Sequence, residues 1–321
     1  MQKEAKINAH HRREFCCFQR FIVIYHDDQD GFASALVAWH ALQLRDGYEL
    51  VYFKPFQYKQ HLNMGTEYKD AIVYILDFSF DKETLDKLDK VAKDIRVIDH
   101  HASSYDELKD TEYLLIHDPT RAGCVLAWNH FFPSEFVPPL LLTIQDRDLW
   151  LFIRTGTKAV CLALDLLKRS FLVWQKHLNN TDELYEKGMG ILQYVEKEVE
   201  RVVKGAAFVI NFGESGLFAV AINTQAHTSD VCHYLIENKH AHIACCYYDT
   251  FRNAVPTRKF EVRSLKGTGY AREIAECYGG GGHPDAAGFE IPLTEVPREW
   301  LIHSERSLEN LLTSTASQEE K

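Results

Sequence analysis

The chain has 321 residues, of which 46% are hydrophobic, and 46 acidic side chains outnumber 36 basic ones to give a formal net charge of −10. This length and apolar content are enough for two domains with cores of their own. Tight non-specific binding to long nucleic acid usually depends on a basic excess, so the charge disfavours a binder of long duplexes but leaves room for a small anionic substrate.

The cysteine spacing and the length of the apolar runs predict where in the cell the protein is located. The eight cysteines include two adjacent pairs but no Cys-x-x-Cys spacing, which favours reduced, mostly buried thiols over disulfides or zinc ligands. The segment 1–15 lacks the apolar core of a signal peptide, and the longest apolar runs are too short to span a bilayer. We therefore expect a cytoplasmic protein with no membrane partner. The sequence does not define its oligomeric state, and a homodimer is one option.

The first half of the chain alternates between patterns typical of strands and of helices. Residues 31–44 and 81–94 have helical composition. Apolar runs bounded by polar residues predict strands at 21–26, 49–56, 71–78 and 95–101. This alternation predicts an α/β domain with a mostly parallel sheet and helices on both faces. In such sheets the ligand site lies beyond the carboxyl ends of the strands.

The second half begins with helical patterns and ends with a second mixture of strands and helices. Packed helices are expected at 122–132 and 138–150, and the charged amphipathic stretch 183–204 suits a connector helix. Further expected elements are strands at 206–212, 216–223, 241–249 and 259–265 and a helix at 270–278. We expect an N-terminal domain at 1–182, the connector helix, a smaller mixed-sheet α/β domain at 205–300 and a polar tail at 301–321.

A group of acidic and imidazole side chains follows the first predicted strand. His26, Asp28 and Asp30 are spaced by two, which in an extended segment directs all three side chains to one side. Carboxylates with one imidazole suit a hard or borderline metal ion, and Gly31 permits a sharp turn into the next helix. The alternative is an acidic turn with Asp30 as the helix N-cap, which accounts for one aspartate only. We therefore favour a metal site.

Two other strands end in residues of the same types. Asp77 closes the apolar run 71–76, and Asp99, His100 and His101 close the strand before the following helix. A turn or cap residue is the alternative for a lone aspartate, and histidine pairs also occur on surfaces by chance. Their position at the same sheet edge as the first group favours a shared site.

A third pair of carboxylates, Asp146 and Asp148, lies near the end of a predicted helix. Taken alone, Asp146, Arg147 and Asp148 are better explained as a simple surface ion pair at a helix end. In the second domain, four successive glycines at 279–282 permit a close approach of backbone N–H groups to an anion, and His283 adds a donor. Arg263 on a neighbouring strand could contact phosphate. The alternative is a flexible linker, although the run leads at once into another strand.

These elements, in this order, resemble the DHH phosphoesterase superfamily, which is named for its Asp-His-His motif. The matching segments are YHDDQDG at 25–31, Asp77, IDHHAS at 98–103 and TIQDRDLW at 143–150, and then GGGGHPDAAGF at 279–289 with VRSL at 262–265. The last two resemble the DHH-associated C-terminal domain. The first motif lacks a proline common in nanoRNases. The Asp-x-Asp-x-Trp of the fourth is more similar to NrnB-like oligoribonucleases and cyclic-nucleotide phosphodiesterases than to NrnA-like enzymes.

The resemblance implies a catalytic N-terminal domain with two divalent metal ions, typically Mn²⁺, although the ligand types also admit Mg²⁺ or Fe²⁺. One ion would be bound by His26 and Asp28, and Asp77 would bridge the two. The ligands implied for the other are Asp30, His100 and Asp146, with Asp146 chosen over Asp148.

The resemblance also implies the residues that act on the substrate. Asp99 and His101 would be catalytic, with His101 facing the scissile phosphate or the attacking water. The implied substrate-binding residues are Arg263, Ser264, Gly280, Gly281, Gly282 and His283. A metal pair of this kind activates water near neutral pH and neutralises the charge of the phosphate.

The function that follows is hydrolysis of short oligoribonucleotides, with 3′,5′-bisphosphate nucleotides as additional substrates. A cyclic mono- or dinucleotide phosphodiesterase would use the same site, and the sequence does not separate the two. A different class of protein, an inactive relative that binds nucleic acid or a partner protein, would be expected to have lost metal ligands, and this chain retains them. The length leaves no room for the extra domain of RecJ-like exonucleases, which favours short substrates.

Overall fold

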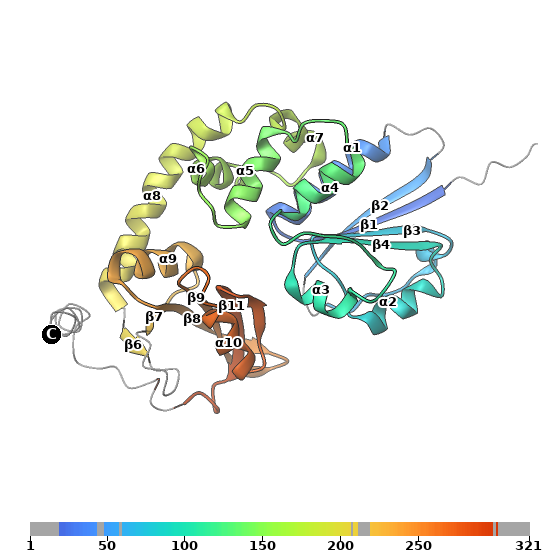
Figure 1. The fold of residues 1–321 in the computed structure, drawn as a ribbon. Helices are drawn as coiled ribbons and strands as arrows, with labels where there is room; N and C mark the ends of the chain where they lie inside the picture. Colours follow the sequence, from blue (N-terminus) through green and yellow to red (C-terminus); the bar gives the residue numbers. More distant parts are fainter. Residues whose placement is uncertain are drawn as a thin grey trace, which may run out of the picture. The chain divides into compact units, whose positions relative to one another are not determined.

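The computed structural model describes residues 19–43, 48–57, 60–206, 208–210, 219–297 and 300. The expected polar tail at 301–321 and the segment 1–15 lie outside this range. The chain divides into two compact units, one made of 1–157 and 165–181 and the other of 158–164 and 182–321. Each unit has its own sheet (Figure 1).

The sheet of the first unit is entirely parallel. Its strands are β1 (Gln19–His26), β2 (Tyr48–Phe56), β3 (Ile72–Leu76), β4 (Asp94–Asp99) and β5 (Leu114–His117), in the spatial order β2-β1-β3-β4-β5. The order reverses between β1 and β3. In doubly wound sheets this reversal opens a crevice at the carboxyl ends of the two strands.

Helices cover both faces of this sheet, as the alternating pattern predicts. On one face α2 (Lys82–Asp89) and α3 (Ala102–Leu108) contribute Leu85, Leu88 and Leu108 to a core with side chains of β1, β3 and β4. The other face is covered by α1 (Gln29–Gln43) and α4 (Gly123–Phe131), and α5 (Pro139–Asp148) packs against both of these helices (Figure 1). The Asp81 side chain caps α2 by accepting the Thr84 N–H at 2.7 Å.

Shorter elements complete this unit and connect it to the next. They are η1 (Thr66–Tyr68), α7 (Phe171–Trp174) and η2 (Gln175–His177). Helix α6 (Thr157–Asp165) belongs almost entirely to the second unit, which includes residues 158–164. Helix α8 (Asp182–Ala206) is 25 residues long and carries Val195, Val199 and Val203 as a buried stripe at four-residue spacing. None of the helices in the described ranges combines the length and apolar character needed to cross a bilayer.

The second unit has a mixed sheet of six strands. They are β6 (Phe208–Ile210), β7 (Ala219–Asn223), β8 (Ile243–Arg252), β9 (Val255–Ser264), β10 (Gly281–His283) and β11 (Ala286–Pro292), in the order β10-β11-β9-β8-β7-β6. Only the β7–β8 pair is parallel among these. Helix α10 (Tyr270–Cys277) packs on one face, and α9 (Thr228–Lys239) with α8 packs on the other.

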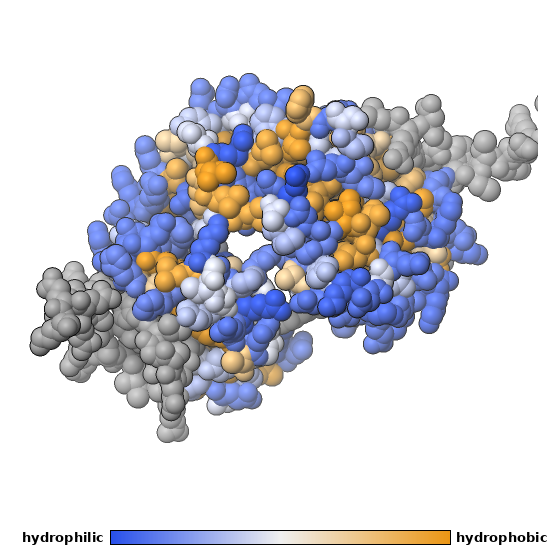
Figure 2. Space-filling view, viewed as in Figure 1, coloured by the Kyte–Doolittle hydropathy of each residue, from blue (hydrophilic) through white to orange (hydrophobic). Residues whose placement is uncertain are grey.

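The α/β class, the parallel first sheet and the smaller mixed sheet were all predicted correctly. The elements that were not predicted are the helices α3, α6, α7 and α9, the strands β5 and β10, and the short helices η1 and η2. Of the six cysteines in the described residues, five are buried and Cys277 is exposed, in keeping with the expectation of mostly buried thiols. Figure 2 shows a surface that is largely hydrophilic, with apolar side chains gathered in separate patches.

Candidate metal centre

The predicted metal ligands of the first unit meet at the carboxyl edge of its sheet. His26 is the last residue of β1, Asp77 directly follows β3, and Asp99 is the last residue of β4. Because β1 and β3 are the strands between which the order reverses, His26 and Asp77 flank the crevice that this topology creates.

The first group of possible ligands comprises His26, Asp28 and Asp77, whose ligand atoms all lie within 4.8 Å of one another. His26 Nδ1 lies 2.7 Å from Asp28 Oδ2 and 3.8 Å from Asp77 Oδ2. Burial alone would raise the pKa of Asp28, but the hydrogen bond to His26 lowers it overall.

The predicted geometry of this group was wrong in one respect. Asp28 and Asp30 do not share one side of an extended segment, because α1 already begins at Gln29. Asp28 instead accepts the Gly31 N–H at 2.9 Å, as a helix-capping residue does, and it therefore takes the capping role that Asp30 was considered for. The turn separates the two aspartates into different groups.

The second group comprises Asp30, His100 and Asp148, again with ligand atoms within 4.8 Å. His100 Nε2 lies 3.5 Å from Asp148 Oδ2 and 4.0 Å from Asp30 Oδ2. Partial burial and the facing carboxylates of Asp30 and Asp28 raise the pKa of Asp148 well above its ordinary value. Burial and the neighbouring His101 lower the pKa of His100, which favours the neutral form that binds metal.

Asp77 lies between the two groups. Its Oδ2 faces His26, whereas its Oδ1 lies 3.2 Å from His100 Nε2. The side chain is 1% exposed, and neither oxygen accepts a hydrogen bond from the residues that the structure describes. Burial and the carboxylates of Asp30 and Asp28 raise its pKa well above the ordinary value. Its backbone has φ 65°, a conformation uncommon for residues other than glycine.

These features fit a pair of divalent cations. A buried carboxylate without donors is unfavourable unless a cation compensates it. Carboxylate oxygens combined with imidazole nitrogens are ligands for Mn²⁺, Fe²⁺ or Zn²⁺, and the carboxylates also suit Mg²⁺. Each oxygen of Asp77 is directed to a different histidine, which is the arrangement needed for one carboxylate to bridge two ions.

Asp99 and His101 form a hydrogen-bonded pair and lie with Asp77 and His100 in a third group of possible ligands, whose ligand atoms are also within 4.8 Å of one another. Asp99 Oδ1 lies 2.7 Å from His101 Nδ1 and also accepts the His100 N–H at 2.7 Å. Burial alone would lower the pKa of His101, but the Asp99 carboxylate raises it to about 9. Burial would raise the pKa of Asp99, but His101 holds it well below the ordinary value. Asp99 therefore orients the imidazole and, in the absence of metal, favours its protonated form.

The contacts of the two aspartates favour Asp148 over Asp146 as the candidate ligand. Asp146 accepts the Ile153 N–H at 3.0 Å, the Arg154 N–H at 3.1 Å and the Thr157 hydroxyl at 2.5 Å. Both of its oxygens are thus used to hold the turn after α5. Near the end of a helix, two residues that are two positions apart face in different directions, and here it is Asp148 that reaches His100.

Helix α4 supplies a contact that the sequence interpretation missed. Its first two N–H groups, from Gly123 and Cys124, donate to the two Asp30 oxygens at 2.6 and 2.9 Å. The positive end of the helix thereby holds an aspartate of the second group. Gly123 also lies against Asp77, because a Cβ added there would lie 2.7 Å from the Asp77 Cβ. The glycine just before an apolar helix was the available signal.

We therefore expect Gly123→Ala to lower activity by about tenfold or more, while helix α4 remains folded. The added methyl would displace Asp77, which belongs to the first group and contacts His100 of the second at 3.2 Å. A shift of this carboxylate spoils the geometry on which positioning depends. The measurement is kcat/KM together with bound metal per chain. Gly190→Ala on α8, where a Cβ meets nothing within 4 Å, is the matched control. Wild-type activity in Gly123→Ala would contradict the close packing described.

The predicted substrate-binding residues lie in the second unit. The glycine run is not a free loop, because Gly281–His283 forms β10 and pairs with β11. Arg263 donates to the Ser229 hydroxyl at 2.9 Å. Ser264 is 7% exposed, and its hydroxyl contacts Asp285, Thr268 and the Ala271 N–H. Ser264 is thus engaged inside its own unit, at the start of α10.

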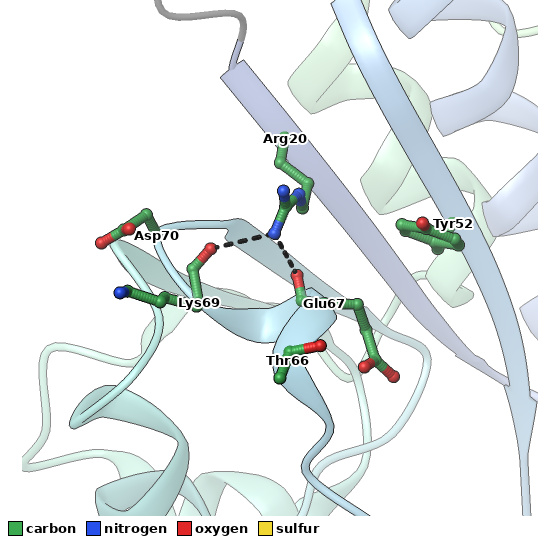
Figure 3. Close-up of a pocket in the computed structure, with 6 residues that line it drawn as sticks. All are labelled: Arg20, Tyr52, Thr66, Glu67, Lys69 and Asp70. Atoms are coloured by element: carbon green, nitrogen blue, oxygen red, sulfur yellow. Dashed lines mark hydrogen bonds between the residues drawn. The ribbon is translucent and has the colours of Figure 1, made fainter.

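A large cavity lies away from the metal ligands. It has a volume of about 510 Å³ and is lined by Arg20, Tyr52, Thr66, Glu67, Lys69 and Asp70. Arg20 donates to the carbonyl oxygens of Glu67 and Lys69, each at 3.3 Å (Figure 3). Because Arg20 is near the start of β1, this cavity is at the amino end of the sheet, opposite the histidines and aspartates described above.

Comparisons with known proteins show what the chain and its fold are similar to. Residues 20–144 match the family model described as DHH family, N-terminal domain. The chain is 27% identical over 280 residues to the uncharacterized protein R106 of Acanthamoeba polyphaga mimivirus, a match that covers 83% of this chain and 66% of that protein.

Comparison with solved structures gave several matches, and two of them have the following identity and coverage. The pGpG-specific phosphodiesterase PggH from Vibrio cholerae is 15% identical with a TM-score of 0.51, covering 93% of this chain and 99% of that chain. RecJ in complex with Mn²⁺ from Thermus thermophilus is 14% identical with a TM-score of 0.48, covering 94% and 52%. At 15% identity, the likeness to PggH is evidence of a shared fold.

Residues 20–144 are thus similar to the N-terminal domain of the DHH family, whose model they match, and their sheet topology agrees with that likeness. Together with the groups of aspartates and histidines at the sheet edge, the match and the topology define the class of protein as a metal-dependent phosphoesterase.

Proposed function

We propose that this protein hydrolyses phosphodiester bonds in short nucleotide substrates with two divalent metal ions, as a nanoRNase-type enzyme using Mn²⁺. The observation that carries the proposal is Asp77, a buried carboxylate between two groups of ligands that faces a different histidine with each oxygen. His26, Asp28 and Asp77 would hold one ion, and Asp30, His100, Asp148 and Asp77 the other. Ions held there would activate water and neutralise the charge of the phosphate.

His101 would act on the substrate itself. Its Nδ1 contacts Asp99, so the opposite ring atom, Nε2, would donate a proton to a phosphate oxygen or to the leaving group. In the metal-free protein the raised pKa, about 9, favours the protonated form of this imidazole at neutral pH. The Asp99 carboxylate, which also accepts the backbone N–H groups of His100 and His101, fixes the orientation of the ring.

The second unit would hold the anionic end of the substrate. His283, Ala286 and Arg263 are consecutive partners across β10, β11 and β9, so their side chains lie in one row on one face of the sheet. The small Ala286 leaves space between the two larger side chains. A phosphate there could contact both an imidazole and a guanidinium. This supports Arg263, His283 and the glycines 280–282 as substrate-binding residues. Ser264 fits this role less well because of its internal contacts.

Two observations favour a short nucleotide as the substrate. The net charge of −10 disfavours long nucleic acid, whereas a small anion can be bound by a few local cations. PggH, whose fold is similar, is by its name specific for pGpG, which is a linear dinucleotide. A linear dinucleotide offers one phosphodiester for the metal centre and a terminal phosphate for a second contact.

The decisive experiment is a substrate panel with Mn²⁺. The panel contains di- to pentaribonucleotides, pGpG, 3′-phosphoadenosine 5′-phosphate, and cyclic mono- and dinucleotides. We expect the highest kcat/KM on the linear di- to tetranucleotides, complete loss with excess chelator, and recovery when Mn²⁺ is restored. Asp77→Asn protein, purified in parallel, controls for contaminating nucleases.

Other outcomes would identify a different function. Preference for a cyclic nucleotide would replace the nanoRNase proposal with a cyclic-nucleotide phosphodiesterase. Hydrolysis that persists after exhaustive chelation would contradict the two-metal mechanism. A protein that binds no stoichiometric Mn²⁺ and hydrolyses nothing would be an inactive relative.

A further inference from the structure

The row of polar residues at the carboxyl edge of the first sheet extends one strand beyond the metal ligands. His117 is the last residue of β5 and is the register partner of Asp99 on β4. Neighbouring strands are about 4.8 Å apart, so His117 stands directly beside the Asp99–His101 pair. Its Nε2 lies 3.2 Å from the His101 carbonyl oxygen.

The same carbonyl anchors an aromatic side chain. The Tyr105 N–H donates to the His101 oxygen at 3.2 Å, so Tyr105 lies one helical turn after His101 on α3. Its ring stacks on His117 with centroids 4.8 Å apart and an interplanar angle of 29°. Tyr105, His117 and His101 are therefore joined by one backbone oxygen and one ring stack.

Tyr105 is more exposed than a residue needed only for packing. It is 44% exposed, whereas Ser104 and Leu108 on the same helix are buried and supply its contact with the sheet. An aromatic ring that is supported from below by His117 and partly open to solvent can present a flat apolar surface. Bases of single-stranded nucleic acid stack on such surfaces, and every base has a face that can do so.

We propose that Tyr105, supported by His117, is a stacking platform for a base of the nucleotide substrate, next to the catalytic His101. This inference rests on the proposed function and deepens it by assigning a residue that recognises the nucleotide. The platform distinguishes substrates that carry a base from those that do not, rather than one base from another. Fixing the base on the turn after His101 would also align the adjacent phosphate with the metal centre.

The test compares a ribodinucleotide with matched dinucleotides in which one of the two bases is absent. For Tyr105→Ala we expect KM for the complete dinucleotide to rise at least fivefold. For one of the two baseless substrates, the one lacking the stacked base, we expect less than a twofold change. Tyr105→Phe should restore the wild-type KM because it retains the ring, and Tyr105→Leu should not, because it retains apolar bulk only.

A matched control is available on the same domain. Tyr52 has a similar exposure, 37%, but lines the cavity at the opposite end of the sheet, so Tyr52→Ala should not affect KM (Figure 3). Equal KM increases for Tyr105→Ala and Tyr52→Ala, or equal increases on complete and both baseless substrates, would overturn the proposal.

A binding measurement separates this proposal from the proposed function. Calorimetric titration of the Mn²⁺-loaded protein with AMP and with ribose 5-phosphate needs no turnover. We expect wild type, but not Tyr105→Ala, to bind AMP at least fivefold more tightly than ribose 5-phosphate. A Tyr105-dependent preference for AMP in a protein that hydrolyses no oligonucleotide would uphold the platform and refute the nuclease. If the protein hydrolysed dinucleotides but Tyr105→Ala changed neither KM nor the preference for AMP, the nuclease would be upheld and the stacking platform refuted.

Discussion

Replacing Asp77 with alanine should lower kcat/KM by at least about a thousandfold, which corresponds to roughly 4 kcal/mol of barrier. The reason is that both oxygens of one carboxylate face the two groups of ligands, so a single substitution affects both. The loss should be mainly in kcat, because positioning and charge neutralisation act on the transition state. Bound metal per chain should fall in parallel.

The stability of the metal-free protein should change in the opposite direction to activity when Asp77 is replaced by an uncharged residue. Without metal, the buried Asp77 carboxylate faces Asp30 and Asp28, which raises its pKa above that of the unfolded chain. Because the pKa is higher in the folded protein, the metal-free protein loses stability as pH rises from the unfolded-state pKa of Asp77 through its raised folded-state pKa. Asp77→Asn keeps the shape and removes the ionisation, so metal-free Asp77→Asn should melt at or above the wild-type temperature near neutral pH. Added Mn²⁺ should raise Tm in wild type only.

A nearby aspartate provides the control for this experiment. Asp81 lies four residues later and caps helix α2 from an exposed position. Asp81→Ala should lose about 1 kcal/mol of stability through the missing cap and should retain activity. If Asp77→Ala kept more than a tenth of the wild-type rate, Asp77 would not be the bridging residue.

The parts of the site that the sequence predicts well are those set by strand ends. In a parallel sheet every strand delivers its carboxyl end to the same edge, so polar residues that close apolar runs must come together. His26, Asp77 and His100 were found in this way. His117 ends the run LLIH in the same manner, but the strand is short and was not predicted, so the residue was missed.

The site predictions that differ from the structure concern turns and helix ends, where a shift of one residue changes the direction of a side chain. The alternation assumed for His26, Asp28 and Asp30 ends at the start of α1. Asp28 caps this helix, and the two aspartate side chains therefore point in different directions. The same holds for Asp146 and Asp148 near the end of α5. Gly123 was missed because its role comes from the close approach of Asp77, a contact across the fold.

The pair Asp146→Ala and Asp148→Ala should separate a structural carboxylate from a metal ligand. Asp148→Ala removes a carboxylate that lies 3.5 Å from His100 Nε2 and whose side chain is 27% exposed. We expect kcat/KM to fall at least about a hundredfold, close to 3 kcal/mol of barrier, with loss of about one ion per chain and little change in the Tm of the metal-free protein. Removing one of several crowded carboxylates relieves repulsion in that state.

Asp146→Ala should show the reverse pattern. It leaves the N–H groups of Ile153 and Arg154 and the Thr157 hydroxyl without their acceptor in a region where Asp146 itself is 2% exposed. The turn that they hold includes Trp150 and Phe152 at positive φ, a conformation that surrounding contacts must maintain. Hydrogen bonds to a charged group contribute about 1.5–3 kcal/mol each, so a loss on the order of 3 kcal/mol or more is expected.

The measurements are Tm without metal, bound Mn²⁺ per chain and kcat/KM for both variants side by side. Asp146→Asn is a useful third variant, because its amide oxygen can retain part of the acceptor role and should recover part of the lost Tm. Asp146→Ala should still bind two ions at temperatures where it remains folded. Suppose instead that Asp146→Ala lost an ion at unchanged Tm and that Asp148→Ala kept both ions. Asp146 would then be the metal ligand, and its contacts with the turn after α5 would not describe its role in the metal-loaded enzyme.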